Sequence, residues 1–145
     1  MALNFQVVID CKNPHVLADW WAETLEWIVE PQDEAFIRSM VDQGFATEEE
    51  TTTHNGKLVW KDGAAIGPEE DQDKDTRRRF LFQTVPEDKT VKNRVHWDVR
   101  LNEQDKDDVR AELEARGAKY LWTAKQGPHE WHTMADPEGN EFCIS

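Results

Sequence analysis

Hydrophobic and polar residues alternate along a short segment near the start of the chain. From residue 5 to residue 11 the two-residue period and the β-branched side chains predict a strand. Gln6, Val8 and Asp10 fall on one face of it, and Val7, Ile9 and Cys11 fall on the other. The second face is apolar, so we expect it to meet the core.

The pattern then changes to a helical period. Asn13 suits the N-cap position and Pro14 suits the first helical position. Residues at helical spacing follow on one side, namely Leu17, Trp20, Trp21, Thr24, Leu25 and Ile28. His15, Asp19, Glu23 and Glu26 occupy the other side. This predicts an amphipathic helix that covers one face of a sheet.

The same order of elements returns in the second half. Residues 95–101 alternate strictly, and Asp105 then opens a helix that Gly117 ends. Each strand and helix is followed by strand-like segments: 57–61, 64–66 and 80–85 in the first half, and 119–123, 131–135 and 141–145 in the second. The turn at 136–140 makes the last two segments a hairpin.

These patterns predict an α+β fold made of two βαβββ modules within one domain, residues 1–145. Module one covers about 3–86 and module two about 93–145, joined by a polar linker. We expect curved mixed sheets that enclose a cleft, with the helices outside. The first module is longer, and its extra residues include a predicted short helix between Asp33 and Gly44.

The formal net charge of -13 limits the partners. Such a charge repels nucleic acid phosphates and anionic lipid head groups, and the basic cluster Arg77-Arg78-Arg79 is too short to reverse it. No segment approaches the roughly 20 apolar residues of a membrane span, and the first residues lack the features of a signal peptide. We therefore expect a cytoplasmic protein that binds neither nucleic acid nor membranes, with Cys11 and Cys143 as free thiols.

Three motifs carry a family resemblance. They are residues 10–14 running into the aromatic pair Trp20-Trp21 and Leu25-Glu26-Trp27, then residues 92–99, then residues 136–143. Together they resemble the glyoxalase, bleomycin-resistance and dioxygenase (vicinal oxygen chelate) superfamily, in particular a glyoxalase-like branch common in actinobacteria. Glu26 stands where those proteins usually have glycine. The resemblance implies the two-module fold predicted above.

The resemblance also implies four positions for metal ligands in the cleft. Carried over by position, they are Gln6, Gln83, His96 and Cys143. Members that isomerise hemithioacetals or open epoxides need carboxylates where this chain has Gln83 and Cys143, and a glutamine amide cannot accept the substrate's proton. We therefore do not expect ordinary glyoxalase I activity. If a divalent metal binds, His96 and Cys143 favour zinc over magnesium.

Each of these residues also has a structural interpretation. His96 can be a polar cleft or surface histidine, and Cys143 can be a small residue packed in a sheet. A third possibility is a nucleophilic thiol with His96 as its base. The stretch His129-Glu130-Trp131-His132 lacks the helical context of a zinc motif, so we interpret it as structural or as part of a cleft rim. We interpret His15 and His54 as solvated cap and loop residues.

Further polar and aromatic residues are candidates for contacting a ligand. Alternation places Asp10 with Gln6, and Asp98 and Arg100 with His96. Of the seven tryptophans, Trp60 and Trp131 lie on later strands away from the predicted helices, and we expect them to stack on a flat apolar ligand.

Three hypotheses for function remain open at this point. The first is a small-molecule-binding protein of unknown specificity, and the second is a metal-dependent lyase, isomerase or dioxygenase-like enzyme with an atypical metal site. The third is protein interaction through the acidic segment at about 30–75, which also fits a solvated loop surface. The resemblance further implies a homodimer.

Overall fold

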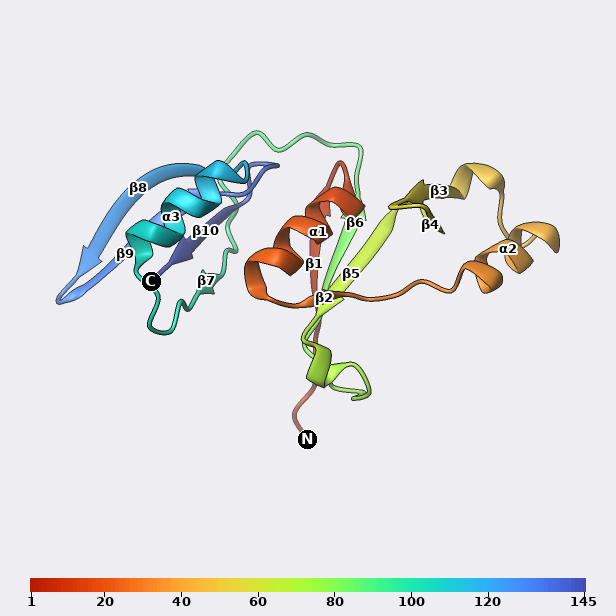
Figure 1. The fold of residues 1–145 in the computed structure, drawn as a ribbon, viewed down its shortest axis with the longest axis horizontal. Coiled ribbons are helices and arrows are strands. Elements are labelled where there is room, and N and C mark those ends of the chain that lie inside the picture. The colour runs from red at the N-terminus through yellow and green to blue at the C-terminus, as the bar shows by residue number, and fades with distance from the viewer. The chain divides into compact units, whose positions relative to one another are not determined.

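The computed structural model describes residues 1–145 and divides them into two units, Met1–Pro86 and Glu87–Ser145 (Figure 1). The division falls at the start of the predicted linker. None of the α-helices combines the length and the apolar character that crossing a membrane requires.

The first unit is built on a four-stranded mixed sheet. Its strands, in order across the sheet, are β1 (Val7–Cys11), β6 (Phe80–Thr84), β5 (Gly63–Gly67) and β2 (Ile28–Val29). The outer strand β1 runs parallel to β6, and the other neighbours are antiparallel. The first predicted strand is therefore present, although it begins two residues later than expected.

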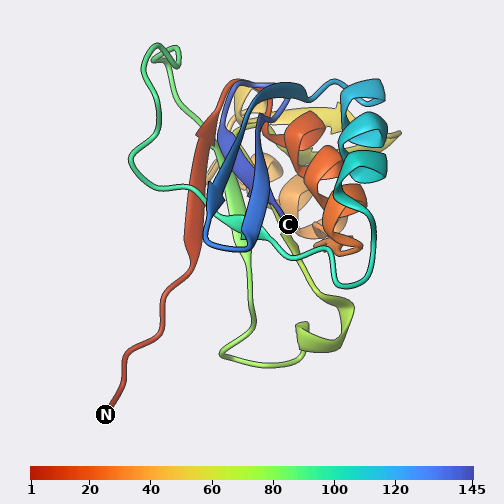
Figure 2. The ribbon, with the colours of Figure 1, turned by 90° about the vertical axis from the view of Figure 1, so that its left-hand side faces the viewer.

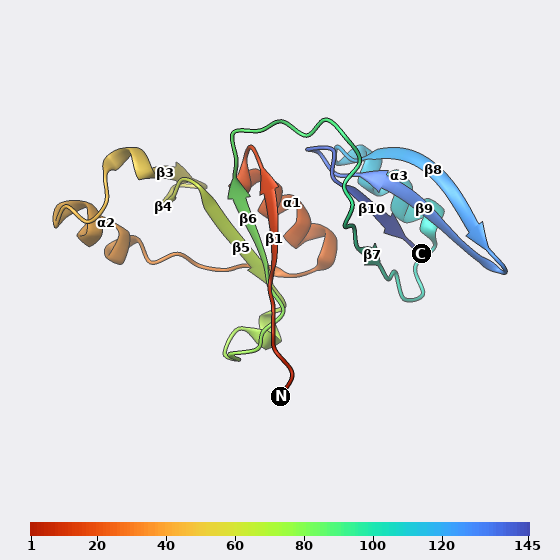
Figure 3. The same ribbon diagram turned by 180° about the vertical axis from the view of Figure 1, so that it is seen from behind.

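Helix α1 (Pro14–Leu25) covers one face of this sheet. Ile9 of β1 lies opposite Phe82 of β6, and both side chains are buried with Trp21 and Leu17 of the helix. Val8 and Asp10 point to the other side and are exposed. Figure 3 views the strands β1 and β6 with α1 behind them. The predicted assignment of the two faces is confirmed.

The end of α1 differs from the prediction. The periodic pattern carried the helix to Ile28, but it ends at Leu25 and Ile28 begins β2. The cause is Glu26, whose backbone adopts a left-handed conformation with φ 57°, so that the Trp27 N–H turns back to the carbonyl of Ala22.

The extra residues of the first unit form a helix and a hairpin between β2 and β5. Helix α2 (Glu34–Asp42) begins at Asp33, whose carboxylate accepts a hydrogen bond from the Phe36 N–H, as predicted. A 3₁₀ turn η1 (Glu48–Glu50) leads into β3 (Thr51–His54) and β4 (Lys57–Trp60). Asn55 and Gly56 join them with positive φ at both positions, as a tight hairpin turn requires.

This hairpin overturns the interpretation of two histidines as solvated. His15 is buried at the start of α1, with Nε2 2.7 Å from the backbone oxygen of Trp60. His54 is partly buried, and its Nε2 lies 2.7 Å from the Asp19 carboxylate. The two rings lie 5.1 Å apart and connect the hairpin to α1.

One residue of the acidic segment is also not solvated as expected. Asp71, at the end of the 3₁₀ turn η2 (Glu69–Asp71), is buried and accepts hydrogen bonds from the Arg78 side chain and backbone. It holds a loop in which Gly67 approaches the Arg78 carbonyl so closely that a Cβ would lie 2.7 Å from it.

The second unit repeats the topology of the first. Its sheet has the order β7 (Asp98–Val99), β10 (Glu141–Ile144), β9 (His129–Ala135) and β8 (Lys119–Gln126). In both units the first strand is outermost and parallel to the last, which confirms the paired βαβββ modules. Strand β7 is shorter than the predicted 95–101.

Helix α3 (Lys106–Ala115) packs on one face of this second sheet, as Figure 2 shows. It begins at Asp105, whose carboxylate caps the first turn, and ends before Gly117, as predicted. Leu113 is its buried apolar residue, and the sheet contributes Met134, Phe142 and Ile144 to the core.

Candidate functional site

The open face of the second unit is the side of its sheet opposite α3. The covered side is identified by His132 of β9, whose Nε2 lies 2.7 Å from the Asp107 carboxylate of α3. His132 pairs with Ile144, so Cys143 and Thr133, one position away on their strands, point to the other side. The motif at 129–132 is thus structural, because the His132 Nδ1 is also hydrogen-bonded to the Thr123 hydroxyl.

One row of side chains crosses this open face. Asp98, Cys143, Thr133 and Trp122 are paired in register across the four strands, and paired residues share a face. Trp131 precedes Thr133 by two residues and therefore lies on the same side. The open face of the second unit combines polar groups at one edge with two indoles toward the other.

Three potential ligand atoms come together at the polar edge. One atom each from His96, Asp98 and Cys143 lies within 4.8 Å of the others. His96 and Asp98 are exposed and Cys143 is buried. His96 Nε2 is 3.7 Å from the Asp98 carboxylate, so the two attract each other when the imidazole is protonated. We call these three residues the donor cluster.

The protonation of Cys143 decides which chemistry the donor cluster supports. Burial raises the pKa of the Cys143 thiol, the hydrogen bond with Thr133 lowers it by less, and the neighbouring Asp98 carboxylate raises it. The thiol is therefore protonated at neutral pH. This environment is the opposite of the electropositive one that activates a nucleophilic cysteine.

The donor cluster fits a zinc-type ion by its chemistry. An imidazole nitrogen, a carboxylate oxygen and a thiolate sulfur are all zinc ligands, and a bound cation favours the deprotonated thiol. Asp98 was expected as a cleft residue and not as a metal ligand, although its two-residue spacing from His96 already placed both side chains on one face.

In the first unit, the open face is the side of its sheet opposite α1. Asp10 and Gln83 lie opposite each other on β1 and β6, and both are exposed. Val8, Leu81 and Ala65 occupy the same side by register. Asp10 and Gln83 are thus brought together on one face. That they meet the donor cluster stays a prediction.

Gln6, a predicted metal ligand, is hydrogen-bonded to an arginine. Its side-chain oxygen accepts a hydrogen bond of 2.9 Å from Nη1 of Arg79. The same guanidinium donates to both oxygens of Glu30, at 2.8 and 3.0 Å. A metal ion on Gln6 would lie next to this positive charge, which Coulomb repulsion opposes.

Trp60 and Arg100 were also predicted to contact a ligand. Trp60 belongs to the β3–β4 hairpin, where its backbone N–H donates to Gln32. Arg100 is exposed and donates to the Ser145 hydroxyl at 3.3 Å.

Trp122 was missed by the sequence reasoning. A β-bulge between Tyr120 and Trp122 turns these residues to opposite faces, where plain alternation would put them on one face.

Comparisons with known proteins agree with this architecture. A family model described as a glyoxalase-like domain matches residues 6–145. No protein with a curated description matches the chain.

Solved structures share the fold at low identity. The fosfomycin resistance protein FosX from Mesorhizobium loti superposes with a TM-score of 0.62 and 6% identity, over 99% of this chain and 90% of its own. A protein from Agrobacterium tumefaciens has a TM-score of 0.61 and 12% identity, over 99% and 96%. A glyoxalase family protein from Bacillus cereus has a TM-score of 0.57 and 12% identity, over 99% and 93%.

Proposed function

The chain belongs to the glyoxalase-like domain family, and from this premise we propose that it is a small-molecule-binding protein whose ligand lies on the open face of the second unit. One observation carries the proposal: the donor cluster and two tryptophans share a sheet face that no helix of the unit covers.

The side chains of this face favour a flat, partly polar ligand. Indole rings bind planar apolar groups by stacking, and Trp122 is 44% exposed and accessible for such contact. His96 and Asp98 offer one titratable donor and one anionic acceptor at the other end of the row. The ligand we expect has an aromatic or heteroaromatic ring and a polar group that reaches His96 and Asp98.

A second candidate function is a metal-dependent lyase, isomerase or dioxygenase-like enzyme. It is favoured by the proximity of the three ligand atoms in the donor cluster. A divalent metal such as zinc would there supply Lewis-acid polarisation of a substrate oxygen. The exposed side chains of His96 and Asp98 would hold the ion, and the buried Cys143 would provide the third ligand. Glyoxalase I chemistry is not proposed, because Gln83 cannot serve as a base.

Two experiments separate these candidates. Thermal shift with planar heteroaromatic compounds tests binding, because a ligand that prefers the folded state raises Tm. Fosfomycin is included because the chain shares the fold of a fosfomycin resistance protein. Calorimetric titration of zinc into metal-free protein without a histidine tag tests the second. Organic ligands that bind with no zinc present, and with no change after zinc is added, favour the binding protein. Compounds that bind only after zinc is loaded favour the enzyme.

We also propose that the protein is a homodimer, as the family resemblance implies.

A further inference from the structure

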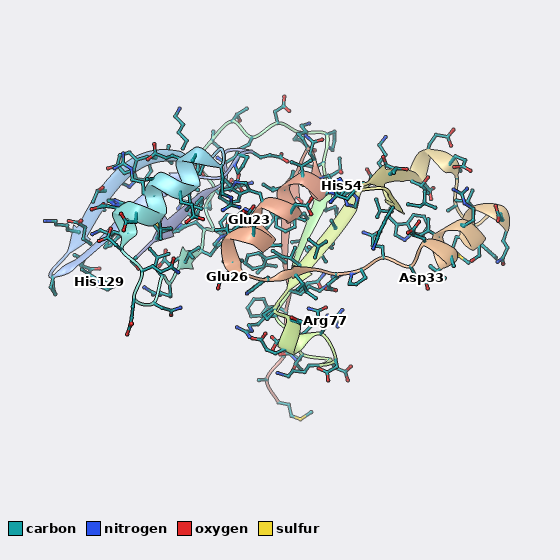
Figure 4. All side chains as sticks on the ribbon, viewed as in Figure 1. Glu23, Glu26, Asp33, His54, Arg77 and His129 are labelled. Carbon is teal, nitrogen blue, oxygen red and sulfur yellow. The ribbon has the colours of Figure 1, made fainter.

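The basic triplet at 77–79 lies where the η2 loop enters β6, and Figure 4 labels Arg77 there. Arg78 is held by the loop itself: its Nε donates to Asp71 at 2.8 Å, and its Nη2 lies 3.4 Å from Glu70. Arg77 and Arg79 instead approach Glu30. Within the triplet, Arg78 is therefore paired with carboxylates of its own loop, whereas Arg77 and Arg79 both pair with Glu30.

The pair Arg77 and Arg79 shares one carboxylate. Arg79 binds Glu30 with two short hydrogen bonds, whereas Arg77 reaches it only through Nη2 at 3.4 Å. Two guanidinium groups against one carboxylate leave a local excess of one positive charge. Such an excess is notable in a protein with a net charge of -13.

Arg77 is incompletely hydrogen-bonded. Its Nε is buried and has no hydrogen-bond partner. A buried donor without a partner is costly, and such groups in native proteins are usually satisfied by a bound water, ion or ligand. Although Nε is buried, the Arg77 side chain as a whole is 33% exposed.

We propose that Arg77 and Arg79 form a subsite for one anionic group, a carboxylate or a phosphate, of a small-molecule ligand. A guanidinium presents parallel N–H donors that match the oxygens of such groups, and partial burial strengthens the attraction. Glu30 orients Arg79 and competes with the incoming anion for Arg77. This inference goes beyond the proposed function, because Arg77 and Arg79 belong to the first unit and the ligand site proposed above belongs to the second.

The test uses inorganic phosphate and acetate as probes, titrated by calorimetry into the full chain at constant ionic strength. We expect phosphate or acetate to bind, and Arg77→Gln to weaken that binding about ten-fold, the loss of one charge-assisted hydrogen bond. Phosphate favoured over acetate assigns a phosphate ligand, and the reverse assigns a carboxylate. Arg38→Gln is the matched control, because Arg38 is an exposed arginine of the same unit that pairs only at the surface with Glu48. It should bind the anion as the unmodified chain does.

Glu30→Gln should change anion binding in the opposite direction to Arg77→Gln. Removing the competing carboxylate should strengthen anion binding, which a purely structural ion cluster does not predict. Circular dichroism checks that each variant is folded. Anion binding that is absent from the unmodified chain, or equal in the unmodified and Arg77→Gln chains, would overturn the proposal.

The outcome also separates this inference from the proposed function. If uncharged aromatic compounds bind and neither anion does, the subsite is wrong and the binding function stands. If an anion binds through Arg77 while no compound of the panel binds, the subsite stands and the function as proposed is wrong.

Discussion

At the scale of single residues, His96 and Trp97 are neighbours with different environments. His96 is exposed and belongs to the donor cluster, whereas Trp97 is half-buried beside β10, whose Cys143 N–H donates to its carbonyl. A polar residue at the surface contributes little to packing, while truncating a tryptophan leaves a cavity.

We therefore predict that His96→Ala abolishes zinc binding with a change in unfolding free energy below about 0.5 kcal/mol. Trp97→Ala should cost about 3 kcal/mol, the lower part of the range for buried aromatics, because the side chain is only half-buried. Urea unfolding with zinc titration measures both. A His96→Ala protein that is unfolded, beside a Trp97→Ala protein of unchanged stability, would show that the two faces are reversed.

Glu26 gives a prediction about the backbone. Its φ of 57° is a conformation that glycine adopts without strain and other residues adopt at a cost. Glu26→Gly should stabilise the chain by about 1 kcal/mol in urea unfolding. Glu26→Ala keeps the Cβ and serves as the control, with no gain expected. Equal or lower stability of the glycine variant would contradict the assignment of strain.

The hydrogen bonds of Asp71 with Arg78 make the stability of the fold depend on pH in the acid range. Its hydrogen bonds with the Arg78 side chain and backbone hold the pKa of this carboxyl well below its usual range. A lowered pKa means that the stabilisation is complete above the pKa of an unfolded aspartate, about 3.9, and is lost as the pH falls toward the folded value.

We expect the unmodified chain to lose stability from about pH 5 downward, and Asp71→Asn, already less stable at pH 7, to lose less over the same interval. Urea unfolding at several pH values measures this. Parallel pH profiles for the two proteins would be inconsistent with this role of Asp71.

At the scale of elements, the sequence predicted the helices and strands that have one clearly apolar and one clearly polar face. The alternation at Val8, Ile9 and Asp10 was enough to assign the faces of β1 because one side packs under α1. The β3–β4 hairpin was only partly predicted, because the polar run Thr51-Thr52-Thr53 carries no alternation. The contacts of this hairpin with His15 and Asp19 of α1 were missed with it.

Helix α3 offers a test of packing at this scale. Leu113 is its buried apolar residue, so Leu113→Ala should cost about 3 kcal/mol of unfolding free energy. Val109→Ala, in the same helix but more exposed, should cost less than half as much. Thermal and urea unfolding compare them, and similar losses would mean that α3 does not pack through Leu113.

At the scale of the whole molecule, the sequence predicted the module order. Strand alternation and the family resemblance, which are both read from local sequence, singled out His96, Asp98 and Cys143, whose ligand atoms lie within 4.8 Å of one another. The contact of Gln6 with Arg79 joins residues 73 positions apart, and no local pattern reveals it. The same holds for Trp122, whose face depends on a bulge.

The homodimer is tested on the intact molecule. Light scattering at micromolar concentrations should give about twice the chain mass of 16.9 kDa. A mass near 16.9 kDa across that range would contradict the dimer.

We propose that a small molecule binds on the open face of the second unit. The NMR signals of the tryptophan indole N–H groups test this binding site most directly. Nitrogen-15 NMR resolves these signals while a planar heteroaromatic compound that raises Tm is added. We expect the signals of Trp122 and Trp131 to shift with saturation, while those of Trp20 and Trp21, which are buried side chains of α1, stay in place. Shifts confined to Trp60, or to Trp20 and Trp21, would contradict it.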